Sequence, residues 1–123
     1  MLPDEAVVVR GGRLVHDTLF KRAGRTRRED GFYVLSVWCG VTQEGETVDV
    51  VLERLVHAAP IPHGQLNVTT AGALRKAGFE LSAAPPPDCH YGVELGTVLD
   101  PDAIDRFVAA FTETRSNLWR RHA

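Results

Sequence analysis

The apolar run from Phe32 to Trp38 is the sequence feature that most constrains the fold, because only Ser36 interrupts it. Gly31 precedes the run, and Cys39-Gly40 closes it. A short, continuous apolar run between such breaks is typical of a strand that is buried on both faces. The run therefore predicts the central strand of a sheet.

Other segments predict the rest of the fold. Residues 48–58 repeat apolar side chains at three and four positions, which predicts a helix. Asp100 and Pro101 form a helix start, and the apolar stripe beyond them predicts a C-terminal helix over 101–121. Further strands are expected at 6–10, 66–69, 79–82 and 90–95, and shorter helices at 14–23 and 71–77. The fold class is α+β, with about five short strands and two or three helices, and the C-terminal helix packs on the sheet.

The composition restricts the class of protein. The chain has 123 residues, of which 44% are hydrophobic, and a formal net charge of -2, so disorder is excluded and residues 1–123 are expected to form one domain. No apolar run approaches the length of a membrane span. The first residues carry acids where a signal peptide carries bases. We expect a cytoplasmic protein, or one delivered without a classical signal peptide.

Basic residues are concentrated near the N-terminus. Residues 10–28 contain seven Lys and Arg residues and one acid, Asp17. Such a concentration indicates either a polyanionic partner or a solvated, mobile segment. Residues 21–31 have no apolar pattern and are expected to form a basic, flexible loop.

Several kinds of catalytic motif are missing from the sequence. The chain has no close Cys-x-x-Cys pair and no His-Glu-x-x-His pair, so no metal site is expected. It also has no Walker loop, no dinucleotide-binding glycine fingerprint and no Gly-x-Ser-x-Gly elbow. Cys39 and Cys89 predict neither a disulfide scaffold nor a nucleophile.

A different set of polar residues lies on or at the ends of the expected strands. Arg10 ends a hydrophobic strand, where a guanidinium is costly unless it is paired or faces a cleft. Ser36 is the hydroxyl of the apolar run, and His90 and Glu94 share one face of a later strand. A guanidinium, a hydroxyl and a carboxylate in one cleft suit a ligand that carries a phosphate and a sugar. Alternatively, each of these residues has a structural role. Tyr91, which shares its face with apolar residues, is either a ligand contact or part of the core.

The order of Arg10, Ser36 and Glu94 on successive strands resembles the ADP-ribosyltransferase fold. The chain is similar, more narrowly, to small bacterial ADP-ribosyltransferase-like toxins, including type VI secretion effectors. The segments that carry this resemblance are Val8-Val9-Arg10-Gly11, Thr69-Thr70-Ala71-Gly72-Ala73-Leu74-Arg75, Asp88-Cys89-His90-Tyr91 and Leu118-Trp119-Arg120-Arg121. The resemblance implies a toxin that uses NAD as a substrate and a neutralising antitoxin or immunity protein as its partner.

The resemblance also implies a role for each site residue. Glu94 polarises the ribose and Ser36 orders its strand, while Arg10 binds the pyrophosphate or the nicotinamide ribose. NAD is also contacted by Gly11, His90 and Tyr91, of which Tyr91 stacks on the nicotinamide. The family's Ser-Thr-Ser stretch is replaced here by Leu35-Ser36-Val37, and only Glu94 remains of its paired acids. An acceptor other than arginine, or a degenerate enzyme, is therefore expected.

Two other functions stay open on the sequence. A non-enzymatic interaction module, such as an immunity protein, an antitoxin or a phage-defence component, would need no special site. A small toxin that acts on nucleic acid could use the basic residues at 21–28, although the net charge of -2 is unlike that of most phosphate binders.

Overall fold

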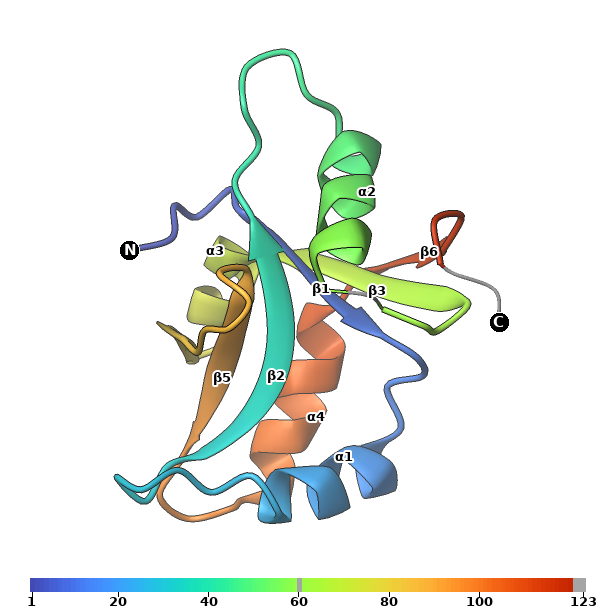
Figure 1. The fold of residues 1–123 in the computed structure, drawn as a ribbon. Helices are drawn as coiled ribbons and strands as arrows, with labels where there is room; N and C mark the ends of the chain where they lie inside the picture. The colour runs from blue at the N-terminus through green and yellow to red at the C-terminus, as the bar shows by residue number, and fades with distance from the viewer. Residues whose placement is uncertain (60, 121–123) are drawn as a thin grey trace.

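The computed structural model describes residues 1–59 and 61–120, which form a six-stranded antiparallel sheet and four helices (Figure 1). The strands are β1 (Val7–Gly11), β2 (Tyr33–Gly40), β3 (Gln65–Thr70), β4 (Glu80–Ala83), β5 (His90–Gly96) and β6 (Glu113–Ser116). The helices are α1 (His16–Gly24), α2 (Val48–Ala58), α3 (Ala71–Lys76) and α4 (Pro101–Ala110). The α+β class is confirmed, but the structure has six strands and four helices where about five strands and two or three helices were expected, because Glu113–Ser116 forms a strand in place of the end of the C-terminal helix.

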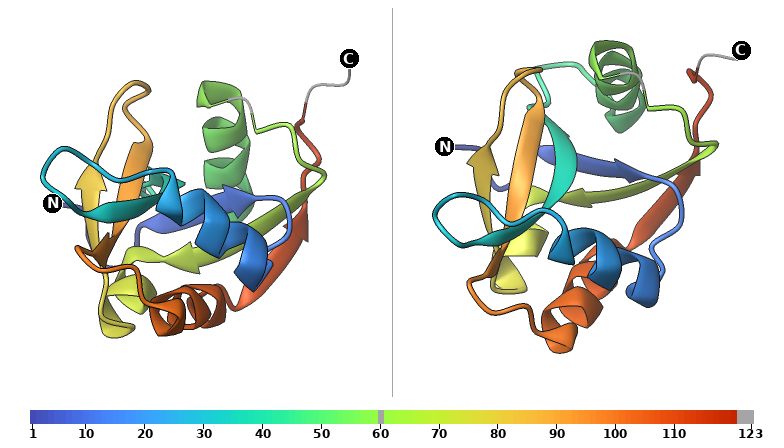
Figure 2. Two further views of the ribbon diagram at one scale, coloured as in Figure 1. Left: turned by 90° about the horizontal axis from the view of Figure 1, so that it is seen from below. Right: turned by 60° about the horizontal axis from the view of Figure 1, so that its bottom comes forward.

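The strands lie in the order β4-β5-β2-β1-β3-β6, so β2 and β1 are at the centre of the sheet. Each neighbouring pair is antiparallel. Figure 2 shows the sheet between α2 on one side and α3 and α4 on the other. Buried side chains of α1 join those of α3 and α4 in one cluster, whereas those of α2 belong to a second cluster.

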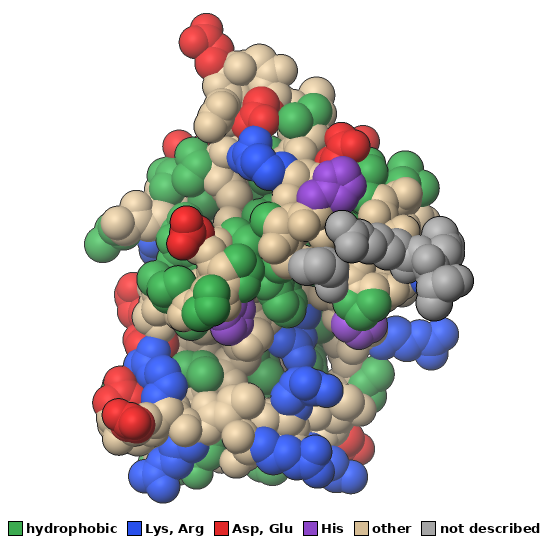
Figure 3. All heavy atoms as spheres, viewed as in Figure 1, with side chains coloured by type: hydrophobic (Ala, Val, Ile, Leu, Met, Phe, Trp, Pro, Cys, Tyr) green, Lys and Arg blue, Asp and Glu red, His purple; other side chains and the backbone are tan. Residues whose placement is uncertain are grey.

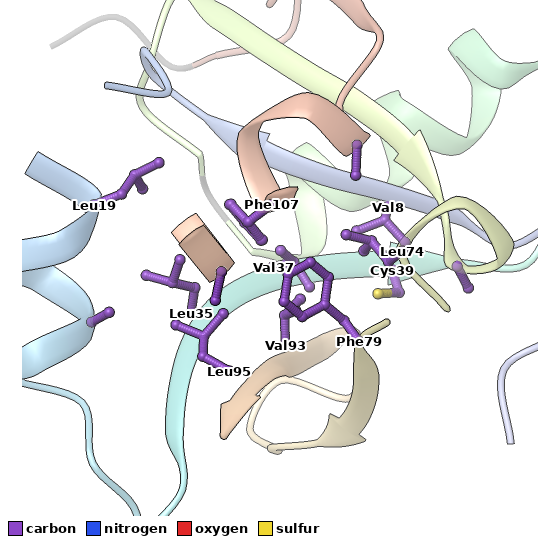
Figure 4. Close-up of a cluster of buried hydrophobic side chains, with 14 of the residues drawn as sticks. Val8, Leu19, Leu35, Val37, Cys39, Leu74, Phe79, Val93, Leu95 and Phe107 are labelled. Atoms are coloured by element: carbon purple, nitrogen blue, oxygen red, sulfur yellow. The ribbon is translucent and has the colours of Figure 1, made fainter. Parts of the chain in front are cut away.

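The larger cluster fills the space between the sheet and the helices α1, α3 and α4. Its strand residues include Val37 and Val93, which pack against the fully buried Phe107 of α4 (Figure 4). Phe79 meets Phe107 edge-on, with ring centroids 6.4 Å apart, an arrangement that aromatic rings favour. The smaller cluster joins α2 to the strands β1 and β3.

The prediction that Phe32–Trp38 is buried on both faces is wrong. Along β2 the burial alternates, because Leu35 and Val37 are buried in the larger cluster while Ser36 and Trp38 are half-buried on the other face. The helix α2 covers that face over β1, β3 and the Gly40 end of β2, so the other end of β2 and part of β5 are left accessible. The apolar run therefore marks a central strand with one buried face and one partly accessible face.

The predicted helix over 101–121 is also wrong beyond Ala110, where α4 ends. Glu113–Ser116 forms β6, which pairs with β3 and supplies hydrogen bonds to an edge that would otherwise be unpaired. Asn117 anchors the next turn, because its buried amide donates to the carbonyls of Ile61 and His63 at 3.0 and 2.9 Å. Arg121, the last residue of the predicted helix, lies outside the described residues.

The predicted flexible loop over residues 21–31 begins inside a helix. Residues 21–24 belong to α1, so the prediction is wrong for them. The remainder is hydrogen-bonded to the sheet, since Thr26 exchanges bonds with Val34 and Arg27 forms a bridge with Tyr33. No helix in the described part of the chain is long and apolar enough to cross a membrane.

Candidate functional site

The sheet is open between its two central strands. Strand β1 pairs with β2 only through Val7–Val9, opposite residues 38–40. Beyond that point, Arg10 and Gly11 remain paired with β3, while the first half of β2 remains paired with β5. A cavity of about 370 Å³ lies at this opening. Its size is at the lower end of the range for small-molecule sites.

Arg10 reaches across the opening. Its Nη1 donates to the main-chain carbonyl of Ser36 at 2.6 Å, and it forms no ion pair with a carboxylate in residues 1–59 and 61–120. Loss of solvation, and to a lesser extent the nearby charge of Arg22, lower the pKa of Arg10 to about 10. A half-buried guanidinium without a counter-charge is a costly feature that an anionic ligand would relieve.

The other residues around the cavity add to its positive charge. Arg13 and Arg22 line it together with His63, and no Asp or Glu is among the described residues that do so. In Figure 3, Lys and Arg side chains gather on the lower part of this face, over and around α1. A site with several cations and no acid suits a phosphate group.

The main chain beside Arg10 is held rigidly. The buried Asn67 of β3 donates from its amide to the carbonyls of Arg10 and Gly12, at 3.0 and 2.5 Å. Gly11 packs against an imidazole, since a Cβ at this position would lie 2.5 Å from His63 Nδ1. Gly12 has a φ of +87°, which favours glycine. These contacts fix one wall of the cavity.

Strand β2 forms the opposite wall of the cavity with its partly accessible face. Val34, Ser36 and Trp38 alternate along the strand, and all three line the cavity. The indole of Trp38 also packs on the smaller cluster. The centroids of the Trp38 and His90 rings are 5.7 Å apart. His90 Nδ1 lies 2.7 Å from the carbonyl of Ala84, which can only accept, so this nitrogen carries a proton.

Glu94 lies on the same face as Ser36 but outside the cavity. It is directly opposite Val34 in the register of β5 and β2, and opposed residues of a sheet share a face. Arg28 Nη2 donates to Glu94 Oε2 at 2.5 Å, and Nη1 of the same guanidinium donates to Ser82 at 2.6 Å. Hydrogen bonds to Asp30 and then to Glu94 raise the pKa of Arg28. The carboxylate of Glu94 is therefore paired with Arg28.

Of the predicted site residues, the structure brings Arg10, Gly11 and Ser36 together in the cavity. His90 and Glu94 lie on the neighbouring strand and on the same face. Tyr91 points to the other face, where it packs against the larger cluster, so its alternative interpretation as a core residue fits.

Three residues at or beside the cavity were not predicted from the sequence to belong to this site. Trp38 and His63 line the cavity, and Asn67 holds the main chain next to it. Trp38 ends the apolar run that was predicted to be buried on both faces, and neither Asn67 nor His63 belongs to a motif. The alternation of β2 could have indicated Trp38, because it is two residues from Ser36. Nothing in the sequence shows that residue 63 lies against Gly11 and Gly12 at the end of β1.

The cysteines take no part in this site. Burial raises the pKa of Cys39 to about 12 and also raises that of Cys89, so neither thiol is an activated nucleophile. Residues 1–59 and 61–120 contain no group of three or more His, Cys, Asp or Glu side chains that could hold a metal ion.

No protein-family model, curated protein or solved structure matches the chain.

Proposed function

We propose that this protein is an ADP-ribosyltransferase-like toxin that binds NAD at the opening between β1 and β2. The observation that carries the proposal is the guanidinium of Arg10, which is half-buried at the cavity and has no carboxylate partner in the described ranges 1–59 and 61–120. The pyrophosphate of a dinucleotide supplies the missing negative charge. Arg13 and Arg22 strengthen the attraction.

The position of the three strands supports the proposal. Arg10 is on β1, Ser36 on β2 and Glu94 on β5, and these strands are successive neighbours in the sheet. Ser36 and Glu94 lie on one face, which α2 leaves uncovered at this end. A ligand bound by Arg10 in the cavity can thus extend over β2 towards the carboxylate.

In the proposed reaction, the bond between ribose C1′ and the nicotinamide nitrogen breaks, and nicotinamide leaves with the bonding electron pair. Glu94 accepts a hydrogen bond from a ribose hydroxyl and stabilises the positive charge on the sugar. An acceptor nucleophile, or water, then bonds to C1′ and releases a proton. This role requires Glu94 to exchange its bond with Arg28 for one with the ribose. A toxin of this kind also needs a neutralising partner protein.

The test is isothermal titration of the protein with NAD, together with a chromatographic assay for nicotinamide release. We expect Arg10→Met to weaken NAD binding about tenfold or more, because hydrogen bonds between charged groups are the strong ones. We expect Glu94→Gln to bind NAD but to release nicotinamide about a hundredfold more slowly, by loss of charge stabilisation.

The matched control is Arg54→Met, since Arg54 lies on α2, is paired with Glu46 and does not line the cavity. It should leave NAD binding unchanged. A folded wild-type protein that does not bind NAD at millimolar concentration would contradict the proposal and favour the non-enzymatic interaction module. Equal losses in Arg10→Met and Arg54→Met would show a general effect of charge rather than a site.

A further inference from the structure

An indole, a guanidinium and a carboxylate lie in a row along the partly accessible face of β2. Trp38 is at one end, Ser36 is next, with Arg10 bound to its carbonyl, and Val34 follows, with Glu94 opposite on β5. Side chains two residues apart on a strand are separated by about 6.6 Å. The row therefore spans about 13 Å from the indole to the strand position beside the carboxylate.

This row has the order of the parts of a dinucleotide. An aromatic side chain suits a flat base, a guanidinium suits the phosphates, and a carboxylate suits a ribose hydroxyl. The carboxylate and the indole are too far apart to contact the same nucleoside, because a base and its own ribose are adjacent. The base at Trp38 and the ribose at Glu94 must then belong to opposite ends of the ligand.

We infer that Trp38 is the stacking residue for the purine of the bound dinucleotide and that it sets the direction of the ligand along β2. The inference rests on the proposed function. The adenine lies at Trp38, the pyrophosphate at Arg10 and the nicotinamide ribose at Glu94. Trp38 thus takes a stacking role like the one that the family resemblance implied for Tyr91, but for the other ring of NAD.

The surroundings of Trp38 support this role. Its indole packs against the imidazole of His90, and the Nδ1 of His90 is hydrogen-bonded to the main-chain carbonyl of Ala84. An aromatic ring that is already held in place loses little conformational entropy when a base stacks on it. The cavity of about 370 Å³ has room for one nucleotide and not for both, so the second nucleotide lies on the open sheet towards Glu94.

Fluorescence provides a direct test, since the chain has two tryptophans. The variant Trp119→Phe leaves Trp38 as the single reporter, and Trp38→Phe leaves Trp119. AMP, ADP and nicotinamide mononucleotide are titrated separately into both variants. We expect AMP and ADP to quench Trp38 but not Trp119. We expect nicotinamide mononucleotide to bind without changing the fluorescence of Trp38.

Affinity provides a second measurement. Trp38→Leu, which keeps an apolar side chain but removes the ring, should weaken ADP binding about tenfold. Trp38→Phe, which retains a ring, should recover most of that loss. A merely structural role would lower the thermal stability of Trp38→Leu without this difference in affinity between the leucine and phenylalanine variants.

The outcomes separate this inference from the proposed function. Quenching of Trp38 by nicotinamide mononucleotide alone would show that the dinucleotide runs the other way and would overturn the inference. NAD binding that depends on Arg10 but not on Trp38 would overturn it while leaving the proposed function intact. Binding of AMP and ADP through Trp38 without any nicotinamide release from NAD would support the purine site and contradict the enzyme.

Discussion

The substitution Arg10→Met tests whether Arg10 is retained for a ligand at the expense of stability. The fall in the pKa of Arg10 to about 10 from its ordinary value corresponds to about 3 kcal/mol against the charged form in the folded protein. Methionine keeps the length of the side chain and removes the charge. It also forfeits the hydrogen bond to Ser36 O, which contributes about 1.5–3 kcal/mol for a charged donor.

The two effects nearly cancel, so we expect Arg10→Met to unfold at the same temperature as the wild type or a few degrees higher. The melting temperature of a domain of this size rises by about 4 °C for each kcal/mol added to its free energy of unfolding. Arg75→Met is the control, because Arg75 has the partner that Arg10 lacks, with Asp4 Oδ1 2.7 Å from its Nη1. The control should melt at a lower temperature, and a drop of more than about 4 °C in Arg10→Met would refute the reasoning.

Two further measurements on this variant follow from the same argument. Pyrophosphate should raise the melting temperature of the wild type and not that of Arg10→Met, since a ligand at about a hundred times its Kd adds about 2.7 kcal/mol. The unfolded chain holds the Arg10 proton more tightly than the folded chain. The stability of the wild type relative to the variant should therefore rise as the pH increases above about 10.

Two further substitutions and one thiol reagent test other parts of the structure. Asn67→Ala removes two buried hydrogen bonds, to Arg10 O and Gly12 O, and should lower the free energy of unfolding by about 2–3 kcal/mol in urea titration; a smaller loss would mean that water replaces the amide. Gly11→Ala forces a Cβ to within 2.5 Å of an imidazole nitrogen and should cost about 1–3 kcal/mol by the same assay, with weaker NAD binding. Cys39, with a pKa of about 12 in a buried position, should not react with a thiol reagent at pH 8 until the protein unfolds, and rapid reaction in the native state would contradict its placement.

Local patterns predicted most of the secondary structure. The helix at residues 48–58 has the bounds expected from its apolar stripe, because Thr47 caps its first turn and the stripe faces one cluster. The alternation in 90–95 correctly placed Tyr91 and Glu94 on opposite faces of one strand. Both the helical stripe and the strand alternation are patterns of residues that lie close together along the chain, so the sequence alone shows them.

The candidate site was predicted in part. Arg10 was singled out because a charge at the end of an apolar strand needs a partner or a cleft, and the structure places it at a cleft. Trp38 was interpreted as a core residue because the run around it is apolar. Only the sheet shows that α2 stops short of this part of β2 and leaves the indole at the cavity.

The C-terminal segment shows where sequence patterns cease to be sufficient. Phe111 continues the apolar stripe of α4, so the local pattern extends the helix, yet the chain leaves the helix after Ala110. The reason is distant in sequence, because β3 has a free edge that Glu113–Ser116 can pair with.

The sequence by itself determined that the chain is an α+β domain with a central strand, and it identified an arginine, a serine and a glutamate on separate strands. The tertiary structure alone decided that β1 and β2 diverge after three residue pairs, because each is held more extensively by its other neighbour. That divergence creates the cavity and leaves Arg10 without a carboxylate within residues 1–59 and 61–120. It depends on hydrogen bonds between residues far apart in the chain, which no local pattern encodes.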